Sequence, residues 1–135
     1  MAGWTTVEEI IAYQRSVTLR DRIVALVESG RLARDFKFRD QMRDAARSAP
    51  SNLSEGFYRY NHGEFAYHAS VAKASLGELK NHLQDARTGN YITEEVFTEL
   101  FALAKESMRT TSGLLRYLRS SKAPKVWPKP PTPRP

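Results

Sequence analysis

Apolar side chains recur at alternating steps of four and three residues over a long stretch in the middle of the chain. The residues on this repeat are Phe65, Ala69, Ala72, Leu76, Leu79, Leu83 and Ala86. Such spacing places them on one face of an α-helix and is typical of antiparallel helices that pack along their length. Gly77 lies in the middle of this expected helix, where glycine lowers helix stability by about 1 kcal/mol relative to alanine. We therefore expect it to mark a point where another helix comes close. The repeat predicts an all-α fold.

Three other segments are expected to form the remaining long helices. They cover roughly residues 5–29, 36–60 and 93–120. Either Thr5 with Glu8 or Thr6 with Glu9 can form a capping box at the start of the first of them. Gly30 is expected to end that helix in a left-handed conformation, with residues 30–35 as a connection. Helices of matched length joined by short turns favour an antiparallel up-and-down four-helix bundle.

The chain divides into this bundle, residues 5–120, and a Pro-rich basic tail, residues 121–135, which is expected to be extended. Its 135 residues suffice for one domain with its own core. The absence of cysteine excludes disulfides and thiolate metal sites. Neither a signal-peptide pattern nor an apolar stretch of membrane-spanning length is present, so we expect a cytoplasmic protein with no membrane partner.

Small residues dominate one run of the second expected helix, residues 45–56. The members of its inward stripe are Phe38, Met42, Ala45, Ala49, Asn52 and Gly56. Alanine and glycine on such a face let a neighbouring helix come close, and Asn52 needs a hydrogen-bond partner on another helix because an unpaired buried amide costs about 1–3 kcal/mol. Pro50 lacks an N–H and is expected to bend the helix or to start a new one. We interpret the run as a helix-packing motif.

Positive charge is concentrated at the C-terminal end of the sequence. Residues 1–100 carry 13 Lys and Arg against 14 Asp and Glu, whereas residues 101–135 carry 8 basic residues and only Glu106. The candidate nucleic-acid-binding residues form a stripe on the last helix and just beyond it: Lys105, Arg109, Arg116, Arg119 and Lys122. Such asymmetry indicates an anionic partner. Tyr117 is the one aromatic residue near the stripe, so little base stacking is expected.

A second run of arginines, Arg39, Arg43 and Arg47, lies on the second helix. Asp40–Arg43 and Asp44–Arg47 have the i,i+3 spacing of ion pairs. This run is therefore interpreted as a solvated face rather than a binding site.

Four-helix bundles often hold two iron ions, and the carboxylate–histidine pairs Glu64/His68 and Glu78/His82 are the candidate metal ligands in this sequence. Both pairs have i,i+4 spacing and lie on one helix, whereas a di-iron site needs Glu-x-x-His on two helices and further glutamates opposite. Glu55 and Glu78 could form a carboxylate pair of raised pKa, but hydrogen bonding within the bundle explains them more simply. We expect no metal, no cofactor and no enzymatic activity.

The first helix carries a second apolar stripe that includes Leu19, Ile23 and Leu26. Two stripes are more apolar surface than one bundle core needs. Either these residues contact another subunit or the helix is broadly buried, and the pattern does not separate the two interpretations. Trp127, in the Pro-rich tail, is a candidate anchor against another subunit.

The run from Gln41 to Gly56, and the later Ala72–Leu79 followed by Tyr91-Ile92, resemble the 23S rRNA-intervening sequence protein family. Relatives of that family include the accessory variability determinant of diversity-generating retroelements. The similarity covers roughly residues 5–120. Its motif residues, taken as structural, are Ser48, Pro50, Ser51, Asn52, Glu55, Gly56 and Glu78. The resemblance implies a four-helix bundle that assembles as a ring-like homopentamer, with nucleic-acid binding in the retroelement branch.

Two functional hypotheses follow. The first is a non-enzymatic homo-oligomeric accessory factor that binds RNA or DNA without sequence preference through the basic stripe. The alternative is a protein–protein interaction scaffold with no nucleic-acid role. The expected partners are further copies of the chain, nucleic acid, and another protein such as a reverse transcriptase.

Overall fold

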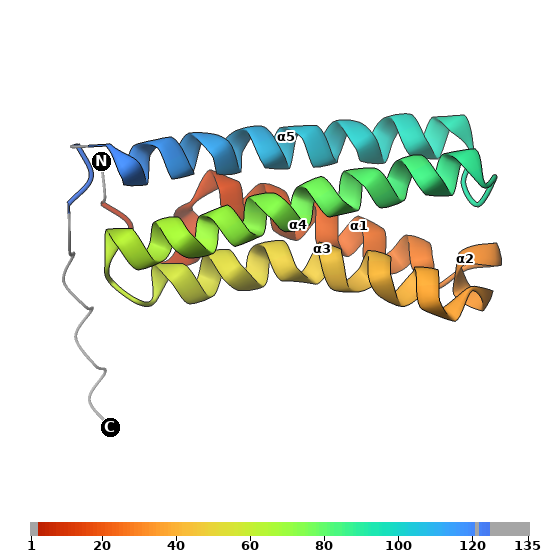
Figure 1. Ribbon diagram of the computed structural model, residues 1–135, viewed down its shortest axis with the longest axis horizontal. Helices are drawn as coiled ribbons and strands as arrows, with labels where there is room; N and C mark the ends of the chain where they lie inside the picture. Colours follow the sequence, from red (N-terminus) through yellow and green to blue (C-terminus); the bar gives the residue numbers. More distant parts are fainter. Residues whose placement is uncertain (1–2, 121, 125–135) are drawn as a thin grey trace, which may run out of the picture.

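The computed structural model describes residues 3–120 and 122–124. They form a short 3-10 helix, η1 (Val7–Glu9), and the helices α1 (Ile11–Val27), α2 (Gly30–Arg34), α3 (Phe36–Phe57), α4 (His62–Thr88) and α5 (Glu94–Arg119), without any strand in these residues. The four long helices alternate in direction (Figure 1), and each contacts two neighbours in the cyclic order α1, α3, α4, α5. The predicted all-α, antiparallel up-and-down bundle is confirmed.

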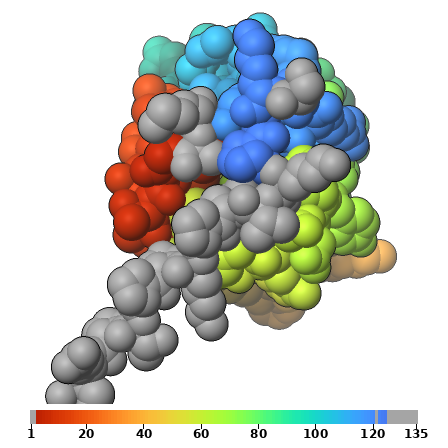
Figure 2. All heavy atoms as spheres, turned by 90° about the vertical axis from the view of Figure 1, so that its left-hand side faces the viewer, coloured from red at the N-terminus to blue at the C-terminus, as the bar shows by residue number. Residues whose placement is uncertain are grey.

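One end of the bundle collects several segments that are distant in sequence. Figure 2 shows the last turns of α5 there, beside the α3–α4 turn and the N-terminal segment. The N-terminal segment is fixed by Trp4, whose ring meets that of Tyr117 edge to face at 5.9 Å. The Pro-rich tail, including Trp127, lies outside the described residues apart from its first positions.

The first expected helix is broken near its start. Glu9 completes a capping box, because its carboxylate accepts hydrogen bonds from the backbone N–H groups of Thr5 and Thr6, at 2.6 and 2.7 Å. Ile10 is then extended, with φ −87° and ψ 123°, and separates η1 from α1. Val7 and Ile10, at 2% and 3% exposed, are both buried at this break. A continuous helix was the wrong prediction here.

The expected connection over residues 30–35 contains a short helix, α2, at Gly30–Arg34. Gly30 is left-handed as predicted, with φ 62°, but it stands at the start of α2. The short helix buries Leu32, which is 1% exposed, and this burial explains why the segment is ordered as helix. It therefore adds apolar contact to the end of the core.

The corner between α2 and α3 is tied to the loop between α4 and α5. Asp35 caps α3 by accepting a hydrogen bond from the N–H of Phe38, and its other oxygen accepts one from the Tyr91 hydroxyl. The Tyr91 hydroxyl is the main reason why the pKa of Asp35 is lowered from its usual range. Arg31 lies over the Tyr91 ring and donates to the carbonyl of Gly89 at 2.7 Å.

The apolar stripe of α1, for which the sequence left a subunit contact and burial equally open, belongs mostly to the core. Leu19 is 1% exposed and Ile23 is fully buried, because α1 packs against both α3 and α5 and each neighbour covers part of its surface. Leu26 is half-buried and packs against the same core. The interpretation of a broadly buried helix is therefore the correct one, and Leu19 and Ile23 are withdrawn as interface residues.

The small residues of α3 bring it close to α4, as predicted. Ala49 is fully buried, and a Cβ built on Gly56 would lie 2.6 Å from the Cβ of His68 and 3.2 Å from the Cα of Phe65. Pro50 stands inside α3, which continues to Phe57, so it does not start a new helix. Gly77 is different: a Cβ there would meet only the end of the flexible Met108 side chain, at 3.4 Å. The close approach lies at Gly56, not at Gly77.

This contrast between two helical glycines gives the first prediction. Gly56→Ala should lower the free energy of unfolding by about 1–3 kcal/mol, because the new methyl group overlaps backbone-fixed atoms of α4. Gly77→Ala should leave stability unchanged or raise it by up to about 1 kcal/mol through its helix propensity. Chemical denaturation of the two variants and the wild type measures both changes. Equal effects at the two positions would contradict the assignment of the close approach.

Candidate nucleic-acid interface

Helix α5 separates its apolar and basic residues onto different faces. Its inner face buries Phe97, Leu100, Ala104 and Leu118, among others. With that face fixed in the core, Lys105, Arg109, Arg116 and Arg119 are all exposed, and Lys122 is exposed just beyond the helix end. Arg116 and Arg119 stand in the last turn, where the helix dipole favours cations. The structure thus places the five predicted residues along one exposed stripe.

The charges of this stripe are not equally available. Arg109 forms a two-point interaction with Glu106, at 2.7 and 3.0 Å, which raises the pKa of Arg109 and lowers that of Glu106. Lys105, Arg116 and Arg119 form no ion pair with any other described residue. The free positive charge therefore lies on either side of Arg109 rather than at it.

A shallow groove of about 510 Å³ runs between α4 and α5 beside the stripe. Lys105 and Arg109 line it from α5, and Lys80 lines it from α4. Lys80 also sits 5.4 Å above the Phe101 ring. Sequence reasoning missed Lys80, because the face that α4 turns toward α5 becomes known only when the two helices are packed. The groove extends the basic surface onto a second helix.

The motif residues Ser48 and Asn52 join α3 to α4 through a polar network. The Ser48 and Ser75 hydroxyls lie 2.7 Å apart, and the Asn52 amide donates to the Ser48 carbonyl at 2.9 Å. The Oδ1 atom of Asn52 is 3.2 Å from Nδ1 of His68. Because that oxygen can only accept, Nδ1 of His68 is the donor. The expected partners of Asn52 on another helix are present.

The motif carboxylates are engaged separately. Glu55 pairs with Arg59 at 2.9 Å, and this hydrogen bond lowers the pKa of Glu55, opposite to what a raised-pKa pair with Glu78 would require. Glu78 is exposed and lies 3.3 Å from His82 on its own helix.

Among the described residues, no group of three or more His, Asp or Glu side chains is placed to hold a metal ion. None of the described helices is long and apolar enough to cross a membrane.

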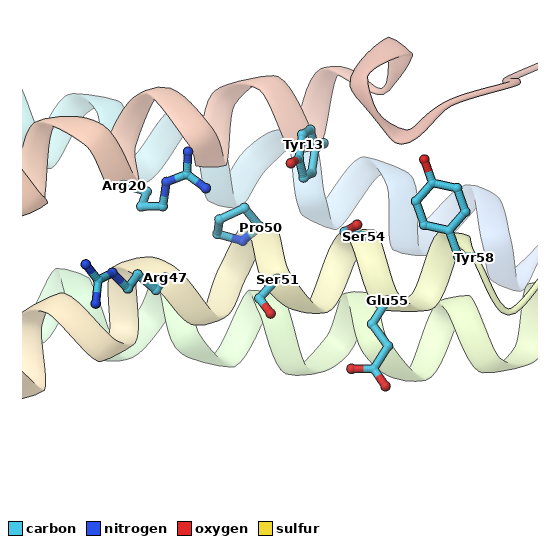
Figure 3. Close-up of a pocket in the computed structure, with 8 residues that line it drawn as sticks. All are labelled: Tyr13, Arg20, Arg47, Pro50, Ser51, Ser54, Glu55 and Tyr58. Carbon is cyan, nitrogen blue, oxygen red and sulfur yellow. The ribbon is translucent and has the colours of Figure 1, made fainter.

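The remaining motif residues face a second groove, of about 600 Å³, between α1 and α3. Pro50, Ser51 and Glu55 line it from α3, with Tyr13 and Arg20 on the α1 side (Figure 3). Arg47 also borders it. The predicted ion pair Asp40–Arg43 forms at 2.8 Å, but Asp44–Arg47 does not. Arg47 instead has no ion-pair partner among the residues that the structure describes.

The chain is similar in sequence to one known protein family and in fold to a solved structure. The model of a family described as 23S rRNA-intervening sequence protein matches residues 8–113. A crystal structure of a protein of unknown function from the S23 ribosomal protein family of Bacteroides thetaiotaomicron is similar, with a TM-score of 0.70 and 16% identity. The similarity covers 82% of this chain and 100% of that one, and at this identity it concerns the fold alone. No curated protein matches the chain significantly.

The polar network gives a prediction about the role of the motif. Asn52→Ala should lower the free energy of unfolding by about 1–3 kcal/mol, because it removes the hydrogen-bond acceptor of His68 and one of the two partners of the Ser48 hydroxyl. Ser51→Ala, one residue away, is the control: its hydroxyl forms no hydrogen bond within the described residues, so a change below about 0.5 kcal/mol is expected. Thermal or chemical denaturation measures both. If Asn52→Ala were as stable as Ser51→Ala, the network would not hold α3 to α4.

Proposed function

This chain belongs to the 23S rRNA-intervening sequence protein family, and we propose that it is a non-enzymatic, homo-oligomeric accessory factor that binds nucleic acid. The observation that carries the proposal is the exposed stripe of α5. Lys105, Arg116 and Arg119 present cations that no described carboxylate neutralises, and Lys80 adds a further cation from α4.

The length of the stripe suits a phosphate backbone. From residue 105 to 119 the helix rises by about 21 Å, at 1.5 Å per residue. Phosphates of one DNA strand follow each other at about 3.4 Å, so several of them fit along this length. Binding would release condensed counterions, which makes the affinity fall steeply as salt is raised. We expect a Kd in the micromolar range or weaker near physiological salt.

The surface offers little means of reading sequence. Tyr117 is half-buried and its ring is engaged with Trp4, so it is not free to stack on a base. Contacts from lysine and arginine to phosphates position a nucleic acid but carry no sequence information. The proposal is therefore one of binding without sequence preference, to RNA or DNA alike.

Charge reversal on the stripe tests this proposal. The double variant Lys105→Glu/Arg116→Glu should weaken binding to a 20-nucleotide single-stranded RNA by at least about tenfold at low salt and should flatten the salt dependence. The control is Arg34→Glu/Lys37→Glu, which makes the same change in net charge at exposed positions near the α2–α3 corner. Fluorescence anisotropy at two salt concentrations measures both variants.

Two outcomes would contradict the proposal. Equal losses in the stripe variant and the control would mean that net charge alone drives binding. No binding by the wild type at low salt would favour the alternative, a protein–protein scaffold with no nucleic-acid role.

The oligomeric part of the proposal is supported by the family resemblance, which implies a ring of five copies. With Leu19 and Ile23 buried, the large apolar side chain that α1 still exposes is Ile11, at 49%. Light scattering during size-exclusion chromatography should give a mass five times that of one chain at micromolar concentration. A monomeric mass under those conditions would contradict the assembly, whatever the result with nucleic acid.

A further inference from the structure

A small apolar groove of about 230 Å³ lies between the start of α1 and the C-terminal half of α5. The apolar side chains that line it are those of Trp4, Ile10, Ile11, Ala12, Leu114 and Tyr117. Ile11 is 49% exposed, although its neighbours Ile10 and Ala12 are buried at 3% and 2%. The groove therefore presents a large aliphatic side chain of which the described residues leave about half uncovered.

The size of the groove suits one large side chain better than a small-molecule ligand. Pockets that hold such ligands enclose about 300–1,000 Å³, which is more than this groove offers. Aromatic side chains bury about 150–250 Å² each and supply the largest apolar contact that a single residue can make. We therefore expect the occupant to be an aromatic side chain on a segment of polypeptide.

The rim of the groove is acidic. Glu9 lines it, and Glu8 precedes Glu9 in η1. The Oε2 atom of Glu9 accepts hydrogen bonds from the N–H groups of Thr6 and Thr5, which lower the pKa of this carboxyl and keep it charged at neutral pH. Its Oε1 atom accepts no hydrogen bond from a described residue, and neither glutamate forms an ion pair with one. A segment that carries cations beside its aromatic side chain would complement this rim.

The chain itself contains such a segment. The structure describes it as far as Pro124, and eleven residues follow in the sequence. Trp127 is the one aromatic residue among these eleven, and it stands between Lys125 and Lys129. Residues 122–135 include no Asp or Glu. The chemistry of the tail is thus complementary to that of the groove.

The tail also begins close enough to reach the groove. The last turns of α5 lie beside the N-terminal segment at one end of the bundle (Figure 2). Leu114 stands five residues before the end of α5, a rise of about 7.5 Å. Beyond the helix, Ala123 is 8% exposed and its N–H bonds to the carbonyl of Ser120, so the chain stays against this end. The three residues from Pro124 to Trp127 can span about 11 Å when extended, which exceeds that rise.

From the apolar lining, the acidic rim and this reach, we propose that the α1–α5 groove holds the Trp127 side chain of the same chain. The indole ring packs against Ile11 and Leu114. Its N–H, which can only donate, bonds to Oε1 of Glu9, and the lysines on either side lie near the acidic rim. The tail thereby covers the seam between the first and the last long helix. This docking does not depend on nucleic-acid binding.

Quenching of Trp127 fluorescence in the full chain tests the docking. Trp4→Phe keeps an aromatic ring beside the groove and leaves Trp127 as the sole tryptophan. Acrylamide should quench it at least about threefold less in the folded chain than in urea, because a packed indole is shielded from solvent. Adding Ile11→Glu, which puts a charge in the groove, should remove this protection. Phe36→Glu is the matched control: it makes the same kind of change at a 66% exposed residue of the other bundle end and should leave the protection intact.

A mixture of two variants separates docking within one chain from docking onto another copy. The reporter chain carries Trp4→Phe and Ile11→Glu, so its Trp127 lacks a groove of its own. A large excess of a chain with Trp4→Phe and Trp127→Ala, refolded together with the reporter, supplies intact grooves and no tryptophan. The reporter should stay unprotected, whereas restored protection would assign the tail to a neighbouring copy and overturn the proposal.

Two further results would overturn it. Trp127 might be quenched equally in the folded and the unfolded chain, which would show that it docks nowhere. Alternatively, Ile11→Glu and Phe36→Glu could leave Trp127 equally protected, which would place it elsewhere on the bundle. Circular dichroism of each variant verifies the helical fold, and both substituted residues are exposed, so neither change removes a buried side chain. Absence of RNA binding at the α5 stripe would not alter any of these results.

Discussion

The close contact between α3 and α4 is the constraint on which the rest of the bundle depends. At Gly56 the two helices approach so closely that even a methyl group would lie 2.6 Å from the Cβ of His68 and 3.2 Å from the Cα of Phe65. Two turns earlier, Ser48 meets Ser75 across the same interface, and Asn52 lies between them and His68. Packing fixes the distance between the helices, and the hydrogen bonds fix their register, because a shift by one turn would leave these polar groups unpaired.

The same stretch of α3 serves two neighbours, because successive residues of a helix point in different directions. Ser48, Asn52 and Gly56 recur every four residues and face α4. Arg47, Ser51 and Ser54 are turned toward the α1 seam and line the groove there. Once the α4 side is fixed by contact, the orientation of the other side follows from the 100° step of the helix. A motif interpreted as pure helix packing thus also places a set of free donors on the surface.

The positions of the helices were predicted well from the sequence, whereas the direction in which each helix face points was predicted less well, because it depends on the neighbouring helices. The apolar repeat from Phe65 to Ala86 and the capping box at the start of the chain are local signals, and a local signal predicts where a helix lies. The direction in which a stripe of α1 faces depends on its neighbours, so the pattern left open whether Leu19 and Ile23 contact another subunit or are buried; α3 and α5 cover them.

The same holds for the charged groups: the sequence predicts which charges share one helix, but not which charges meet where two helices pack. The α5 stripe was predicted because its members lie on one helix, whereas Lys80 joins it only through the packing of α4 against α5. Arg47 was expected to pair with Asp44 on its own helix, yet it forms no such pair and lies at the seam with α1.

Cations on a bundle of this kind reach the grooves between helices, because long side chains lay their apolar stems over the seam and keep their charge in water. Anionic ligands therefore find the charge at seams, and the two seams of this protein differ. The α4–α5 seam offers cations along a line, as a phosphate backbone requires, while the α1–α3 seam combines two arginines with the hydroxyl groups that line it.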